Sequence, residues 1–199
     1  MVTARTVRDG MLFDLPAIGL NEEREEQRRT LTERCETAAA ALADAPSALA
    51  WCHLNAEGDL LTKLTDGAVQ ISGGDDPDAK EEALIAFTRG EIRVLVTKPS
   101  IAGWGLNFQH CHRMTFFPSH SYEQYYQAVR RCWRFGQTQP VTVDVVTTEG
   151  GANVLKNLER KAAQADRMFD ALVRYMRDAL SIRRGNPYDQ PVRVPAWLS

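Results

Sequence analysis

Three arginines and two glutamines lie close together in the segment QAVRRCWRFGQ, which runs from Gln127 to Gln137. Apolar residues in and before this segment predict a helix. Arg131 and Arg134, three residues apart, would then leave the same helix face and converge. Two planar, permanently charged guanidinium groups directed at one point suit a polyphosphate better than a carboxylate. Gly136 predicts the helix end, with Gln137 on the turn beside the arginine pair; a solvated basic face is the alternative interpretation.

A loop that contains two glycines, KPSIAGWGLNFQ, runs from Lys98 to Gln109 directly after the apolar residues 92–96. Such an apolar run predicts a buried strand, and open parallel sheets bind ligands at the carboxyl ends of their strands. Gly103 and Gly105 would let the main chain approach a phosphate closely, although a tight turn is the alternative interpretation. The interpretation of this loop as a ligand-binding loop is favoured because the arginine segment follows it in the sequence.

Short apolar runs alternate with amphipathic segments through the middle of the chain, which predicts an α/β fold with a parallel sheet covered by helices on both faces. We expect strands at 48–54, 68–72, 92–97, 113–117 and 141–147, and helices at 56–64, 77–88 and 121–134.

Two further helices flank this region. The first is expected at 21–45, capped by Asn21 and ended by Pro46, and the second, long and amphipathic, at 152–183. Asp76 or Asp75 is the expected cap of helix 77–88, with Pro77 at its first position. The buried stripe of the first helix is expected to comprise Leu31, Cys35, Ala38, Ala39 and Leu42.

Together, the glycine loop and the arginine segment resemble motifs V and VI of superfamily-two helicases. The likeness is closest to Swi/Snf-like ATP-dependent DNA translocases of the phage or bacterial DEAD/DEAH type. GWGLNFQ matches the pattern G-x-G-L-N-L-Q, and QAVRRCWRFGQ matches Q-A-x-x-R-x-x-R-x-G-Q. Upstream, residues 49–55 resemble the motif IV strand and residues 71–87 resemble a strand–glycine–helix segment. The likeness covers roughly residues 49–180 and implies the second RecA-like lobe, with a C-terminal brace helix.

The sequence departs from the family pattern in the motif V loop. Pro99 and Ser100 stand where the family carries a Ser/Thr–Lys pair, Lys98 lies two residues earlier than the usual lysine, and Ala102 replaces a usual glycine. Arg130 occupies a position that is often acidic, and we assign it no catalytic role. These departures leave open which side chain meets nucleic acid at this loop.

The resemblance implies a function divided between two lobes. Arg131 and Arg134 would be catalytic arginine fingers that act on ATP and Mg²⁺ held mainly by a separate N-terminal RecA-like lobe, in cis or in trans. Other residues in the two motifs would contact the ATP or the nucleic acid. The expected ATP-binding residues are Gln127, Arg131, Arg134, Gln137, Gly103 and Gly105. The expected nucleic-acid-binding residues are His53, Asn55, Gly73, Lys98, Ser100 and Asn107.

Two motifs that a complete motor requires are absent from this sequence, namely the G-x-x-x-x-G-K-[ST] loop and the acidic Mg²⁺-binding string. We therefore expect the isolated chain to be inactive as an ATPase. DNA is the expected partner, with RNA left open. A stand-alone module that binds DNA or another motor without catalysis is the alternative. A different nucleotide- or cofactor-dependent enzyme, such as a small transferase, is disfavoured because no nucleophile–base pair stands out.

Composition and charge agree with a soluble, cytoplasmic protein. The 199 residues, 44% of them hydrophobic, suffice for one core, and no run approaches transmembrane length. The net charge is −2, yet seven basic residues face only two acidic ones between Arg89 and Gln137, a local excess of +5. Such a basic cleft edge on a mildly acidic protein suits a translocase lobe.

The four cysteines are scattered singly and are expected to be reduced core thiols, with no metal site. The expected organisation is an N-terminal arm and helix at 1–46, the helicase C-terminal domain at 47–150, the brace helix at 151–185 and an extended tail at 186–199.

Overall fold

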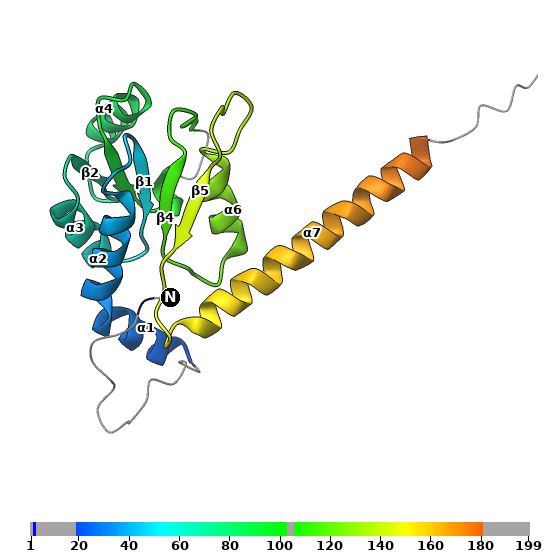
Figure 1. Cartoon of the computed structure of the whole chain (residues 1–199), viewed down its shortest axis with the longest axis horizontal. Helices are drawn as coiled ribbons and strands as arrows, with labels where there is room; N and C mark the ends of the chain where they lie inside the picture. Colours follow the sequence, from blue (N-terminus) through cyan, green and yellow to red (C-terminus); the bar gives the residue numbers. More distant parts are fainter. Residues whose placement is uncertain (1, 3–18, 103–105, 181–199) are drawn as a thin grey trace, which may run out of the picture. The chain divides into compact units, whose positions relative to one another are not determined.

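The structure is a computed structural model that describes residues 2, 19–102 and 106–180 of the chain. Five parallel strands form one sheet in the order β2-β3-β1-β4-β5, which confirms the predicted RecA-like α/β fold (Figure 1). The strands are β1 (Ala48–Trp51), β2 (Ala68–Ile71), β3 (Val94–Thr97), β4 (Arg113–Phe116) and β5 (Thr142–Val145). All five expected strands are present, each shorter than predicted.

Helices cover both faces of the sheet, as continuous apolar strands require. One face carries α2 (Leu31–Leu42) and α3 (Asn55–Leu64), and the other carries α4 (Pro77–Thr88), α5 (Pro99–Ala102) and α6 (Tyr122–Arg130). β1 shows the division clearly, because Leu49 and Trp51 enter the α4–α6 core whereas Ala48 and Ala50 enter the α2–α3 core. The short helix α5 was not predicted.

The expected N-terminal helix is two helices, α1 (Leu20–Arg29) and α2, separated at Thr30. The Thr30 hydroxyl donates to the Glu26 carbonyl at 2.7 Å and accepts from Arg34 Nε at 3.3 Å. Such back-bonding competes with the helical pattern and bends helices. The predicted cap is also wrong, because Gly19 occupies the N-cap position and Asn21 lies inside α1. Likewise, α2 ends at Leu42, before Pro46.

Local sequence signals elsewhere correctly predicted a helix cap, most of a buried helix face and the state of the cysteines. The Asp76 carboxylate caps α4 by accepting from Asp78 N at 2.9 Å, and Pro77 is the first helical residue. On α2, Cys35, Ala38, Ala39 and Leu42 are buried, as the stripe predicted, whereas Leu31 is only half-buried. All four cysteines are free and buried. Burial raises the pKa of Cys35 and of Cys52 to about 12, so both thiols stay protonated at neutral pH.

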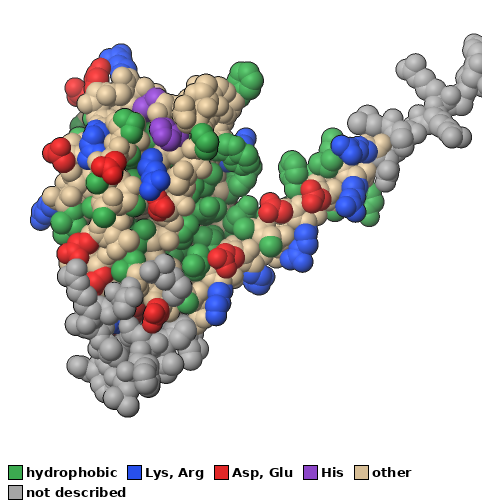
Figure 2. Space-filling view, in the orientation of Figure 1, with side chains coloured by type: hydrophobic (Ala, Val, Ile, Leu, Met, Phe, Trp, Pro, Cys, Tyr) green, Lys and Arg blue, Asp and Glu red, His purple; other side chains and the backbone are tan. Residues whose placement is uncertain are grey.

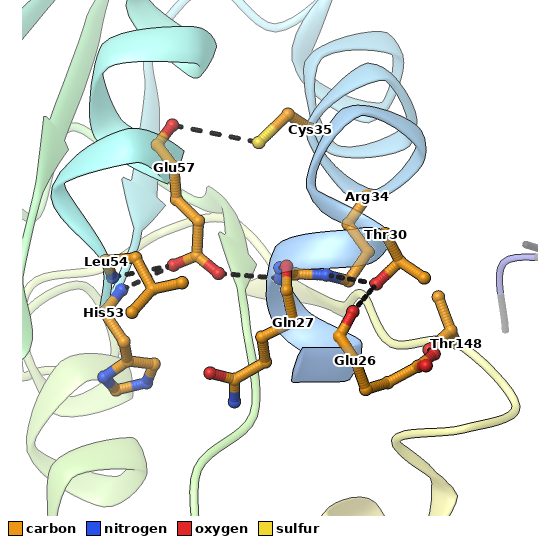
Figure 3. A network of polar contacts seen from close by, with 9 residues as sticks. All are labelled: Glu26, Gln27, Thr30, Arg34, Cys35, His53, Leu54, Glu57 and Thr148. Atoms are coloured by element: carbon orange, nitrogen blue, oxygen red, sulfur yellow. Dashed lines mark hydrogen bonds and ion pairs between the residues drawn. The ribbon is translucent and has the colours of Figure 1, made fainter. Parts of the chain in front are cut away.

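A buried ion pair joins the helices of the α2–α3 face (Figure 3). Arg34 Nη1 donates to Glu57 Oε1 at 2.7 Å, and the two residues are only 4% and 1% exposed. The other carboxylate oxygen of Glu57 accepts from the backbone N–H groups of His53 and Leu54, at 2.8 and 3.0 Å, where α3 begins. Glu57 therefore satisfies backbone donors at the helix N-terminus as well as the arginine.

Arg34 also donates to α1, and the flat face of its guanidinium lies over Phe117, the residue that follows β4. Nη2 donates to the Gln27 carbonyl at 2.6 Å, and the guanidinium carbon lies 4.8 Å from the centre of the Phe117 ring. One side chain thus connects α1, α2, the start of α3 and the end of β4. A buried charge with this many partners is costly to disrupt on one side only.

The chain divides into two compact units, Met1–Lys161 and Ala162–Ser199, and α7 (Ala152–Leu180) contributes to both. Val154 and Leu158 are buried within the first unit. The second unit exposes large apolar side chains among charged ones, visible along the helix in Figure 2. These are Met168, Phe169, Leu172, Tyr175 and Met176. Within the described residues, no helix is long and apolar enough to cross a membrane.

The predicted boundaries at 46, 150 and 185 remain predictions, and the expected arm and tail fall mostly outside the described residues.

Substitution of Arg34 by Met should lower the free energy of unfolding by roughly 3–5 kcal/mol, because it leaves the Glu57 carboxylate buried without its partner. Urea denaturation of the purified chain measures this change. The double variant Arg34→Met/Glu57→Gln should lose less than the sum of the two single variants. Glu81→Gln on exposed α4 is the matched control. A loss below about 1 kcal/mol for Arg34→Met would show that the pair is dispensable.

Candidate functional site

The arginine segment follows α6 rather than lying within it. Ser121 caps this helix, because its hydroxyl accepts from Gln124 N at 3.2 Å. The helix ends at Arg130, not at residue 134 as predicted. The carbonyl of Arg131 accepts from Phe108 N at 2.9 Å, so it does not continue the helical pattern. The chain turns there because the loop before β4 has taken this acceptor.

The two guanidinium groups nevertheless converge. Nη1 of Arg131 and Nη1 of Arg134 both donate to the carbonyl oxygen of Leu106, at 3.1 and 3.3 Å. Nη2 of Arg131 also donates to Gln127 Oε1 at 2.9 Å, one helical turn earlier. The convergence predicted from helical spacing is thus present, but the turn after α6 and the loop at Leu106 produce it.

The pair has an excess of positive charge. Arg131 is 7% exposed and its Nε is buried without a hydrogen-bond partner, whereas Arg134 is exposed. Burial, and then the charge of Arg134, lower the pKa of Arg131 from its ordinary value. In the described part of the chain, no carboxylate forms an ion pair with either arginine. An anion bound here would relieve the repulsion and supply acceptors.

Gln137 holds the loop before β4 against the turn after α6. Its Nε2 donates to the carbonyls of Gln109 and Cys111, each at 3.0 Å, and of Cys132 at 3.3 Å. Gly136, at φ +93°, makes the turn that places this side chain. In this structure the Gln137 amide is therefore a brace, and its expected contact with ATP remains a prediction. Gln127 likewise orients Arg131.

Several of the expected loop residues differ in how the structure places them. Gly103 and Gly105 lie outside the described residues. Asn107 is exposed beside Phe108, which is buried. Sequence reasoning missed Leu106, which accepts from both arginines through its backbone carbonyl. A pattern of side chains does not indicate which backbone carbonyl will act as an acceptor.

The expected nucleic-acid residues gather at the carboxyl ends of three adjacent strands. His53 and Asn55 follow β1, Gly73 follows β2, and Lys98 and Ser100 follow β3. Parallel pairing of β2, β3 and β1 brings these ends to one edge of the sheet.

Two contacts link the residues at this edge to lysines. Lys98 Nζ donates to Asn55 Oδ1 at 2.6 Å, and Lys80 Nζ donates to the Gly73 carbonyl at 2.8 Å. Asn55 is the first residue of α3 and not its cap. Asn55 is exposed and Lys98 is half-buried, and the hydrogen bond between their side chains lies at the surface of this edge.

The His53 ring is half-buried and packs edge-on against Phe116, with ring centres 5.6 Å apart. Burial lowers the pKa of His53, so the ring is neutral at pH 7. Its Nε2 is buried and lacks a partner. Unlike Asn55 and Lys98, it would meet a ligand through its backbone or the rim of its ring.

Trp133 lies outside the hydrophobic core. Its side chain is 56% exposed, because the turn after Arg130 carries it out of the core. Its ring lies under the Arg130 guanidinium, whose carbon is 5.2 Å from the ring centre. Among the described residues, no group of three His, Cys, Asp or Glu side chains could hold a metal ion.

Replacement of Gln137 by Leu should lower the free energy of unfolding by roughly 1–3 kcal/mol, because the part-buried carbonyls of Cys111 and Cys132 and the exposed carbonyl of Gln109 lose their donor. Urea denaturation measures the loss. Gln139→Leu, at an exposed position two residues later, is the control. An unchanged midpoint for Gln137→Leu would contradict the bracing role.

The sequence and the fold were compared with those of known proteins. Residues 44–136 match the model of the Helicase conserved C-terminal domain. No curated protein matched the sequence. Many solved structures resemble the chain, and the three described next are 14–17% identical to it. At these identities the likeness concerns the fold.

The C-terminal part of the Fun30 ATPase domain is 17% identical, with a TM-score of 0.51, and the likeness covers 56% of this chain and 39% of that one. The C-terminal domain of the DEAD-box protein Dbp5 is 14% identical, with a TM-score of 0.55, covering 66% and 79%. S. cerevisiae Dbp5 bound to RNA and ADP BeF3 is 15% identical, with a TM-score of 0.56, covering 65% and 36%.

The chain therefore spans well under half of the Fun30 chain that it resembles. The family match is confined to residues 44–136, and the solved structures share the RecA-like fold of this chain.

Proposed function

We propose that this chain supplies the motif IV–VI lobe of an ATP-dependent DNA helicase or translocase of the Swi/Snf-like type. In this proposal a separate N-terminal RecA-like lobe, in cis or in trans, holds most of the ATP and Mg²⁺. The chain contributes the arginines at one surface and a nucleic-acid edge at another. Support comes from the family match at residues 44–136 and from the convergence of Arg131 and Arg134 on one acceptor.

The converging guanidinium groups are the observation that carries the proposal. ATP with Mg²⁺ would supply the transferable phosphoryl group, whose negative charge arginine side chains stabilise. Arg134, exposed beside Leu106, would meet that charge first, and Arg131 would follow with its unpartnered Nε. Gln127 keeps the Arg131 guanidinium turned toward this point. Gly103 and Gly105 are proposed to lie against the phosphates.

Arg131 must exchange acceptors to take this role, because Leu106 and Gln127 hold its two Nη groups. The exchange is favourable in charge, since a phosphate oxygen is a stronger acceptor for a guanidinium than a neutral carbonyl. The same requirement makes the position of the loop at Leu106 part of the proposed site.

The sheet edge formed by the ends of β1, β2 and β3 is proposed to contact the phosphate backbone of the nucleic acid. Lys98 supplies a charge there, Asn55 and Ser100 supply hydrogen-bonding side chains, and Asn107 is proposed to contribute from the loop before β4. Contacts of this kind carry no sequence information and weaken with salt. The proposal of DNA rests on the motif likeness, while one similar structure, Dbp5, is bound to RNA.

Substitution of Arg134 by Ala should reduce the DNA-stimulated ATPase rate about 10³- to 10⁵-fold once the ATP-binding lobe is restored. Arg131→Ala should fall in the same range. Arg134→Lys should recover little, because an ammonium cannot reproduce the guanidinium fork.

Exposed Arg89→Ala, on the end of α4, is the matched control for charge and should retain full activity. Because Arg134 is exposed, its replacement leaves the core intact, which far-ultraviolet circular dichroism checks. A rate within twofold of the parent for both arginine variants would remove the arginine-finger proposal. Full activity of this chain alone would remove the two-lobe proposal.

Replacement of Lys98 by Gln should weaken DNA binding and reduce the slope of log K against log salt by about one, as expected for one phosphate contact. Fluorescence anisotropy with DNA and RNA of the same sequence, at several salt concentrations, measures both quantities. Exposed Lys63→Gln on α3 is the control. Equal salt slopes for Lys98→Gln and Lys63→Gln would show that Lys98 does not contact the phosphate backbone. Tighter binding of RNA than of DNA would make RNA the proposed nucleic acid.

A further inference from the structure

Four side chains form a ladder along one face of α6 and the turn that follows it. The ring centres of Tyr122 and Tyr126 are 6.1 Å apart. The Arg130 guanidinium carbon lies 6.0 Å from the Tyr126 ring centre and 5.2 Å from that of Trp133. Residues spaced by three or four lie on the same side of a helix, which explains the alignment. We name these four residues the aromatic–arginine ladder.

The carboxyl half of the ladder is open to solvent. Tyr126 is 44% exposed and Trp133 is 56% exposed, and Phe135, just beyond them, is 99% exposed. Burial of large aromatic rings is a major gain in folding, so exposed rings gathered in one place indicate a binding surface. In contrast, Tyr125 on the same helix packs against the core.

We propose that the aromatic–arginine ladder binds single-stranded nucleic acid by stacking unpaired bases on its rings. Grooves that bind single strands combine aromatic side chains with arginines, because every base has a π-face and every nucleotide a phosphate. The ladder offers both within one surface. This inference deepens the proposed function and rests on it in one respect, that the chain acts on nucleic acid.

The charge around the ladder favours an anionic occupant. Arg130, Arg131 and Arg134 lie at its carboxyl end, and Glu123 is the only acidic residue from Tyr122 to Gln137. Because Glu123 lies in the first turn, bases would stack best toward Arg130 and Trp133. An apolar protein partner would leave these arginines to be desolvated without compensation.

The length of the ladder distinguishes a strand from a single base. From Tyr122 to Arg130 the helix rises about 12 Å, at about 1.5 Å per residue. Bases in a stacked strand are about 3.4 Å apart, so several fit along this length. The base of one nucleotide would use only one ring. A duplex offers its bases only at the ends, so the ladder selects single strands.

The test compares oligonucleotide binding by the full chain and by the double variant Tyr126→Ala/Trp133→Ala. The probes are a fluorescein-labelled 15-nucleotide oligothymidylate and a hairpin duplex of 15 base pairs. Loss of a single stacking contact should weaken single-strand binding about 5- to 150-fold, and loss of two should weaken it further, with little change for the duplex. Trp133→Phe should keep most of the affinity, and Glu123→Gln should increase it.

Tyr175→Ala is the matched control, because Tyr175 is an exposed aromatic residue on α7, outside the ladder. Single-strand affinity within twofold of the parent for the double variant would overturn the proposal, and so would an equal loss for the duplex. Quenching of Trp133 fluorescence by AMP at the same base concentration would assign the ladder to a mononucleotide instead. Weaker association with the ATP-binding lobe, with unchanged oligonucleotide binding, would assign it to protein docking.

This test can fail independently of the proposed function. It uses the chain alone and requires no ATP-binding lobe, whereas the arginine fingers are tested by ATPase turnover in the restored motor. A motor that loses turnover on Arg134→Ala but binds oligothymidylate normally without the ladder would keep the first proposal and reject the second.

Discussion

The ion pair between Arg34 and Glu57 holds the α2–α3 face of this lobe together. Glu57 accepts two backbone N–H groups where α3 begins, and Arg34 reaches from that carboxylate to the carbonyl of Gln27 and the ring of Phe117. The backbone between β1 and α3 is therefore held in place by the Glu57 carboxylate and, through it, by Arg34. These contacts fix the backbone at His53 and Asn55, the residues proposed to contact nucleic acid.

A second constraint links the loop before β4 to the turn after α6. The Arg131 carbonyl accepts from Phe108, its guanidinium donates to Leu106, and the Gln137 amide reaches the carbonyl of Gln109. These contacts run between two segments that are separate in sequence, residues 106–109 and 131–137. A displacement of either segment would carry the other with it. In the proposed function, these contacts would couple nucleic-acid binding at the loop to the arginine site.

Charge is distributed unevenly along the chain. The lobe carries a local positive excess between Arg89 and Gln137 although the whole chain is mildly acidic. Arg131 and Arg134 find no carboxylate partner in the part of the chain that the structure describes, while Arg34 is fully paired. The paired arginine stabilises the fold, and the unpaired arginines keep their charge for an anion. Burial and pairing thus decide which arginine is structural.

The sequence alone determined the parallel sheet and its covering helices, because apolar periodicity is a property of neighbouring residues. The segments that it indicated for ATP and nucleic acid remain predictions. It did not determine that α6 ends at Arg130, that the N-terminal helix breaks at Thr30, or that Trp133 is exposed. α6 ends where the Arg131 carbonyl accepts from Phe108 N, and the N-terminal helix breaks where the Thr30 hydroxyl bonds to the Glu26 carbonyl and to Arg34 Nε. Only the tertiary structure decided that both guanidinium groups meet at the Leu106 carbonyl, since that acceptor comes from a residue far away in the sequence.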